Sequence, residues 1–309
     1  MKKKLSALAV ITSLGLILSG CSSSDSNSDA SGIKVVAAMY PLEFVAKSIG
    51  GDLVSVENFT PPGVEPHDLE LTPSQVVTLD DADLLLYISG FQPALEEAAQ
   101  QSAPANSLDL LSVSGLNLLT ATEDGHDHGA EEVHSDEEAV SDPHVWLDPE
   151  RLVVVAKAVA SKLSEVDPEN SEVYATNLAT FVTELGALDQ KFLTGLVSCE
   201  RDLIVTSHAA FAYLADAYGL FQEAIAGLSP ESEPTPKRLN EIGKEAKADG
   251  TTTIFFETLA SPKVAQTLAD DLNIEAAVLD PIEGISEGQT YFSIMESNLG
   301  ALRKALNCK

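Results

Sequence analysis

The sequence predicts an α/β protein of two lobes, each with a central, mostly parallel sheet flanked by helices, joined by one long linker helix. Three observations lead to this fold. The chain has 309 residues, 44% of them hydrophobic, which is enough for two domains with sizeable cores. Short apolar strands alternate with helical segments in both halves, as in βα units. A single amphipathic segment of about 25 residues separates the two halves.

The first half shows the alternation from residue 33 onward. Val54 and Val56 have the period-2 spacing of a strand, and residues 84–88 form an apolar run typical of a buried strand. Asp148 followed by Pro149 is typical of a helix N-cap and first helical residue. We predict strands over 33–38, 53–59 and 84–88, and helices over 41–49, 73–80 and 93–101.

The linker helix is predicted over residues 171–196. Its apolar positions recur in steps of four and three, which keeps them on one face of the helix. At 1.5 Å per residue such a helix is about 40 Å long and stiff, so we expect limited relative motion of the lobes. These apolar positions are Tyr174, Leu178, Phe181, Leu185, Leu188, Phe192 and Leu196.

The second half repeats the rhythm of the first. We predict strands over 203–206, 253–256 and 275–279, and helices over 209–218, 236–248, 262–272 and 291–306. The predicted domains are therefore an N-terminal lobe over 33–168, the linker over 169–198 and a C-terminal lobe over 199–309.

Residues 1–20 form a targeting segment. Three consecutive lysines precede an apolar stretch over 5–18, which is short for a membrane span. The segment ends Leu-Ser-Gly before Cys21 and resembles a bacterial lipobox, which implies cleavage before Cys21 and a diacylglycerol on its sulfur. The alternative is a plain secretory signal with a chance cysteine. Residues 21–32 are rich in Ser, Asp and Asn and are predicted to be a flexible tether. We therefore expect a lipid-anchored protein on the extracytoplasmic face of the cell membrane.

The cysteines are consistent with export. With Cys21 lipidated, Cys199 and Cys308 remain as a pair in an oxidising compartment, and we predict a disulfide between them. It would close a loop of roughly 110 residues and contribute at most about 4–5 kcal/mol in the chain-entropy model. Free thiols acting as metal ligands are a poor alternative, because neither has a Cys or His close by in the sequence.

The formal charge is −30, from 48 acidic and 18 basic side chains. This balance argues against a nucleic-acid partner, because phosphate binding needs a basic face. It favours cations only loosely, since a strongly solvated acidic surface explains most of these residues equally well.

Three histidines and an aspartate share a setting. His67 lies in a stiff, proline-rich turn after the second predicted strand, and His208 directly follows the strand over 203–206. His144 lies in a short segment stiffened by prolines and containing the only Trp, and Asp280 follows the strand over 275–279. Ligands of open parallel sheets bind beyond the carboxyl ends of the strands, so we expect these four residues to meet between the lobes. Three imidazoles and a carboxylate suit tetrahedral Zn²⁺, which would stabilise the closed form of the two lobes.

Six motifs carry a resemblance that covers nearly the whole chain. They are residues 66–74 (PHDLELTPS), 142–149 (DPHVWLDP), 206–208 (TSH), 229–236 (SPESEPTP), 256–257 (FE) and 279–281 (LDP). With these motifs the sequence resembles the metal-binding lipoproteins of bacterial ABC importers for zinc and manganese, the cluster A-I solute-binding proteins. The resemblance implies two α/β lobes with the metal between them. It implies His67, His144 and His208 as ligands, and Asp280 as the fourth ligand or a close neighbour of the ligands. Glu257 would line the cleft in a hydrogen-bonded role.

The resemblance favours zinc over manganese. Manganese members tend to have a carboxylate where this chain has His208, and imidazole suits zinc whereas carboxylates suit Mn²⁺. The acidic loop between residues 120 and 140 contains His126, His128 and His134 and is similar to the His-rich loop of zinc members. For this short loop, a metal-gathering arm and an acidic surface loop both remain open.

We therefore predict a high-affinity Zn²⁺-binding lipoprotein that delivers zinc to an ABC permease as a monomer, with Mn²⁺ as the alternative metal. The alternative of a different class is a zinc hydrolase, because catalytic zinc also often has three protein ligands. The sequence contains no His-Glu-x-x-His motif and no nucleophile motif near the predicted ligands, so we expect no enzyme.

Overall fold

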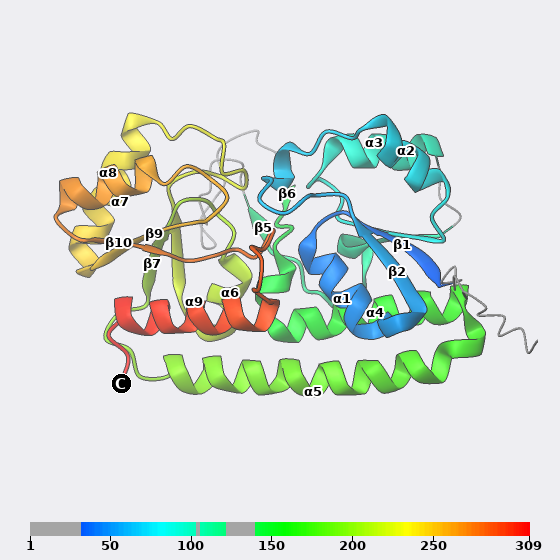
Figure 1. Ribbon diagram of the computed structural model, residues 1–309. Helices are drawn as coiled ribbons and strands as arrows, with labels where there is room; N and C mark the ends of the chain where they lie inside the picture. Colours follow the sequence, from blue (N-terminus) through cyan, green and yellow to red (C-terminus); the bar gives the residue numbers. More distant parts are fainter. Residues whose placement is uncertain (1–31, 103–105, 122–139) are drawn as a thin grey trace, which may run out of the picture. The chain divides into compact units, whose positions relative to one another are not determined.

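The computed structural model describes residues 32–102, 106–121 and 140–309 (Figure 1). Residues Gly32–Lys309 belong to one compact unit. Two four-stranded parallel sheets organise this unit, one from each half of the chain, as the sequence predicts.

The first sheet has the strand order β2-β1-β3-β4. Val35 of the central strand β1 lies opposite Val56 of β2 on one side and Leu84 of β3 on the other, and all pairs are parallel. Its strands are β1 (Ile33–Ala37), β2 (Val54–Asn58), β3 (Leu84–Tyr87) and β4 (Ser107–Asp109).

Two helices of the first half begin at residues whose side chains cap them. The Thr72 side chain and Gln75 form a reciprocal capping box at the start of α2, with Pro73 as the first helical residue. Asp148 caps α4 by accepting a hydrogen bond from the backbone N–H of Glu150. The helices are α1 (Tyr40–Gly50), α2 (Pro73–Asp80), α3 (Pro93–Ser102) and α4 (Pro149–Val166). The 3₁₀ turns are η1 (Gly51–Leu53), η2 (Pro66–Asp68), η3 (Leu110–Ser112), η4 (Val145–Leu147) and η5 (Pro168–Asn170).

The second sheet has the order β10-β9-β7-β8 and is also parallel. Its strands are β7 (Leu203–Thr206), β8 (Phe221–Ala224), β9 (Thr253–Phe256) and β10 (Glu275–Val278). The accompanying helices are α6 (Ala212–Tyr218), α7 (Pro236–Asp249), α8 (Lys263–Leu272) and α9 (Tyr291–Ala305).

The long helix α5 (Ser171–Leu196) has the predicted bounds. Its apolar face is buried, with Tyr174, Phe181 and Phe192 at most 2% exposed. It contacts α1 and α4 from the first half and α6 and α9 from the second, and Figure 1 shows it running alongside α4 and α9. A single helix therefore contacts helices of both halves of the chain. The predicted domain bounds at 168 and 199 remain a prediction, since residues 32–309 form one compact unit.

Three short strand pairings were not predicted from the sequence. β4 has three residues, and the edge strand β8 is half polar with its Phe221 side chain 65% exposed, so neither shows an apolar run. The strands β5 (Thr120–Ala121) and β6 (Val140–Ser141) pair antiparallel across residues 122–139. Helix α6 begins three residues later than predicted, and Ala209 before it donates its N–H to the carbonyl of Gly227.

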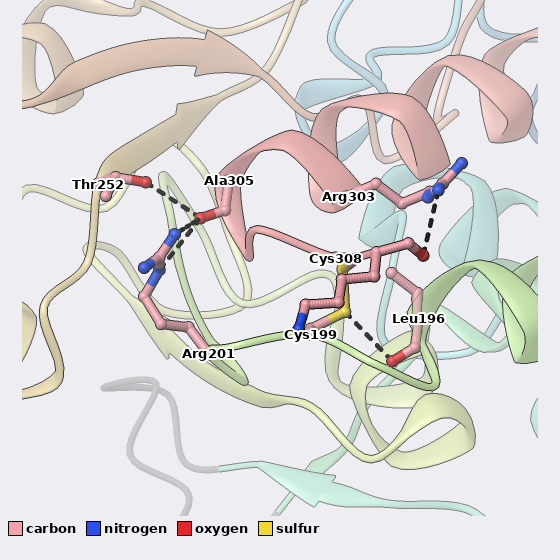
Figure 2. The surroundings of a disulfide bond; sticks show 8 residues. Leu196, Cys199, Arg201, Thr252, Arg303, Ala305 and Cys308 are labelled. Atoms are coloured by element: carbon pink, nitrogen blue, oxygen red, sulfur yellow. Dashed lines mark hydrogen bonds between the residues drawn. A yellow bond between two sulfur atoms is a disulfide. The ribbon is translucent and has the colours of Figure 1, made fainter.

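Cys199 and Cys308 form the predicted disulfide (Figure 2). Nearby, the Arg201 guanidinium and the Thr252 hydroxyl donate to the carbonyl of Ala305, as Figure 2 shows. The C-terminus is thereby held against the start of the second half. No helix within the described residues is long and apolar enough to cross a membrane.

Candidate metal centre

Three histidines and one glutamate converge in the described structure. His67 lies in η2, His144 at the start of η4, His208 just after β7, and Glu283 between β10 and α9. One ligand atom from each lies within 4.8 Å of those of the other three. The Glu283 Oε1 atom is 3.4 Å from Nε2 of His67, 3.2 Å from Nε2 of His144 and 3.3 Å from Nε2 of His208. The chain thus brings the three predicted histidines together.

The spacing fits a tetrahedral ion. Zinc–nitrogen bonds of about 2.0–2.1 Å in a regular tetrahedron give ligand–ligand edges of about 3.3–3.4 Å. The three Nε2–Oε1 separations fall close to that length. Nε2 of His67, Nε2 of His208 and Oε2 of Glu283 are buried without a hydrogen-bond partner among the described residues. Such orphaned lone pairs are costly unless a ligand occupies the space between them.

Two further carboxylates orient the imidazoles. Asp142 Oδ1 lies 2.8 Å from Nδ1 of His144, and Glu257 Oε1 lies 2.9 Å from Nδ1 of His208. A carboxylate at Nδ1 holds the proton there and leaves the Nε2 lone pair free for a metal. Glu257 also accepts from the Ser207 hydroxyl, which matches the hydrogen-bonded role expected for it. Both carboxylates are almost fully buried, so they are fixed in place.

His67 is held by different contacts. Glu65 accepts a hydrogen bond from its backbone N–H at 3.0 Å, and its ring packs on Phe91 with centroids 4.1 Å apart. Its side chain is 10% exposed, whereas those of His144 and His208 are fully buried. Burial lowers the pKa of His67, so this imidazole is neutral and available as a ligand near neutral pH.

Several acidic groups surround the clustered histidines. Burial alone would raise the pKa of Glu283, but its close contacts with the three histidines hold that pKa well below its usual value, so Glu283 is ionised. Burial lowers and the nearby carboxylates raise the pKa of His144 and His208, with the net direction upward for both. Burial and then the charge of Glu283 raise the pKa of Glu65 to about 8. A dication between these groups would relieve the repulsion among the carboxylates.

The carboxylate that lies among the three histidines is Glu283 and not Asp280. Asp280 lies outside the group of mutually close ligand atoms, and its two carboxylate oxygens accept from the N–H of Ile282 and the hydroxyl of Thr258. Glu283, three residues later, takes the fourth place. Both acids lie in the segment after β10, and the sequence alone offered no signal to show which of them reaches the histidines.

A cavity of about 710 Å³ adjoins the site. Among the four clustered residues, only His67 lines it. Much of the remaining lining is hydroxyl or carboxylate, including Ser89, Asp109 and Ser141. The cavity therefore meets the clustered residues at His67, and its lining mixes hydroxyl, carboxylate and apolar groups. His126, His128 and His134 and the lipidation candidate Cys21 lie outside the described residues.

The chain is similar to proteins named for zinc uptake and zinc binding. The chain is 35% identical over its full length to the full-length high-affinity zinc uptake system protein ZnuA of Bacillus subtilis (strain 168). It is 34% identical to the zinc-binding lipoprotein AdcA of Streptococcus pneumoniae serotype 4, with 88% of this chain aligned to 55% of that protein. The chain thus spans about half the length of that relative.

A solved structure shows the same fold. The Zn(II)-bound ZnuA-like domain of Streptococcus pneumoniae AdcA superposes with a TM-score of 0.72 at 31% identity, covering 89% of this chain and 99% of that one. Residues 35–305 match the family model described as zinc-uptake complex component A, periplasmic. With this match over most of its length, and with three imidazoles and a carboxylate that converge closely enough to hold a metal ion, the chain belongs to the ZnuA family of zinc-uptake components.

Proposed function

We propose that this protein captures Zn²⁺ outside the cytoplasmic membrane and delivers it to an ABC permease for import. One observation carries the proposal: the Nε2 atoms of His67, His144 and His208 all lie 3.2–3.4 Å from one oxygen of Glu283. These distances match three of the six edges of a zinc tetrahedron, and the donor set suits zinc. The relatives named for zinc uptake and zinc binding support the same cargo.

Zinc is the transported cargo in this proposal, and His67, His144, His208 and Glu283 are its ligands. Three imidazoles favour Zn²⁺ over Mn²⁺, which prefers oxygen donors. The cavity beside His67 supplies the approach, so His67 is the ligand that an incoming ion meets first. Asp142 and Glu257 then present His144 and His208 with their Nε2 lone pairs already directed at the ion.

The site is built for binding and delivery, and we propose no catalysis. Four protein ligands complete a tetrahedral shell and leave no open position for the water that a catalytic zinc needs. We further propose that the protein acts as a monomer attached to the membrane through lipid on Cys21. The naming of the pneumococcal relative as a lipoprotein supports this attachment.

The test combines metal content, affinity and turnover on the purified protein. We expect one tightly bound zinc per chain, and apo-protein that takes Zn²⁺ in preference to Mn²⁺ in direct competition. We expect no zinc-dependent hydrolysis of ester or peptide substrates. Weak zinc binding, preference for Mn²⁺ or hydrolysis at ordinary enzyme rates would each overturn the proposal.

A further inference from the structure

We propose that Asp280 is a positioning residue that holds Glu283 in place as the fourth zinc ligand. This inference rests on the proposed function and assigns Asp280 a role other than contact with the metal. Asp280 is 6% exposed and close in sequence to Glu283, yet its carboxylate does not belong to the group of clustered ligand atoms.

Hydrogen bonds hold both the carboxylate and the backbone of Asp280 in place. Its Oδ1 accepts the backbone N–H of Ile282 at 2.8 Å, and its Oδ2 accepts the Thr258 hydroxyl at 2.8 Å. Its own backbone N–H donates to Oδ1 of Asn298 at 2.9 Å, and its carbonyl accepts from Nδ2 of the same asparagine at 2.7 Å. Asn298 is a buried residue of α9, and Thr258 follows β9. The segment leaving β10 is therefore anchored to two packed elements.

The residue that Asp280 holds has an unfavourable backbone. Ile282 is fully buried and has φ of +61°, the left-handed region that β-branched side chains rarely enter. Such a conformation persists only where surrounding contacts enforce it. The Asp280 Oδ1 bond to the Ile282 N–H is one such contact. A second is the indole N–H of Trp146, which donates to the carbonyl of Pro281 at 2.7 Å.

The kink at Ile282 determines where Glu283 lies. A residue with ordinary negative φ at this position would send the following side chain in another direction, away from the three Nε2 atoms. The histidines do not depend on this kink, because Asp142, Glu257 and the Phe91 contact hold them separately. Loss of Asp280 should therefore remove the contribution of Glu283 to zinc binding and leave the imidazoles in place.

Two substitutions distinguish positioning from direct ligation. Asp280→Asn keeps an oxygen for the Ile282 N–H, and its amide can donate to the Thr258 oxygen, but it removes the charge. Asp280→Ala removes both contacts. We expect a loss of zinc affinity of about 10–100-fold for Ala, the range typical of residues that orient metal ligands, and a smaller loss for Asn, because Asn keeps both contacts. With Co²⁺ as the probe, the visible absorption of the Asn variant should match that of wild type, and that of the Ala variant should not.

A double-mutant cycle separates positioning from general damage to the fold. In a Glu283→Ala background, adding Asp280→Ala should change zinc affinity by less than about twofold, because the group it positions is gone. If the Asp280→Ala variant does not fold, Thr258→Val replaces it in the cycle. It removes one bond to Asp280, and we expect a smaller loss that also vanishes in the Glu283→Ala background.

Three outcomes would overturn this inference. Equal losses for Asp280→Asn and Asp280→Ala would make the carboxylate itself a ligand. Unchanged affinity for Asp280→Ala would remove its positioning role, and an equal loss with and without Glu283 would make the effect a general structural one. Failure of the wild-type chain to bind zinc tightly would instead refute the proposed function, so the two failures are distinguishable.

Discussion

Replacing Asp142 by Asn tests how the buried carboxylates prepare the histidines. Asp142 Oδ1 accepts both the backbone N–H of His144 and its ring Nδ1, each at 2.8 Å. An asparagine oxygen can keep both contacts, so the substitution removes the negative charge and leaves the geometry in place. The effect on zinc affinity then reports the charge alone.

The expected size follows from the position of the charge. A single negative charge about 7 Å from a dication is worth about 5 kcal/mol at an effective dielectric constant of about 20, which sets a ceiling. Carboxylates that orient metal-bound histidines contribute about 10–100-fold in affinity, or about 1.4–2.7 kcal/mol. We expect the zinc dissociation constant of Asp142→Asn to rise within that range.

The assay is competition of the apo-protein against a chromophoric zinc chelator at fixed pH. Asp52→Asn is the matched control, because it removes the same charge at an exposed position in η1. Thermal unfolding of the apo-proteins shows whether Asp142→Asn also damages the fold. An affinity within twofold of the control, with an unaltered melting temperature, would contradict the role assigned to Asp142.

Three further predictions follow from the site and the disulfide. Removing the imidazole in His208→Ala should abolish most of the zinc affinity in the same competition assay, and an unchanged affinity would remove it from the ligand set. The pKa of His144 and of His208 is raised, so protons compete with zinc on the low-pH side, and affinity should rise with pH through neutrality. Calorimetry in buffers of different ionisation enthalpy should detect protons released on binding, whereas a flat profile from pH 5 to 8 would contradict this. Replacing Cys199 and Cys308 by Ser should lower the free energy of unfolding by up to about 4–5 kcal/mol in denaturant titrations, and an unchanged midpoint would show that the bridge is dispensable.

Local periodicity was sufficient for the elements with strong apolar patterns. β7, β9 and α5 have the predicted bounds, because an apolar strand and a long one-faced stripe each have few alternative structures. Edge strands such as β8 were missed, since their stability comes from pairing with a neighbour and not from their own composition.

The sequence by itself was sufficient to predict which three histidines lie together in the structure. His67 and His144 lie in stiff segments and His208 follows a parallel strand, and ligands of parallel sheets bind beyond the carboxyl ends of the strands. The identity of the fourth clustered group depended on tertiary structure. The backbone of Ile282 is left-handed only because Asp280, Trp146 and their partners enforce it, and that kink places Glu283 among the histidines. A single backbone angle set by distant contacts has no local signature in the sequence, so only the folded chain could decide between the two carboxylates.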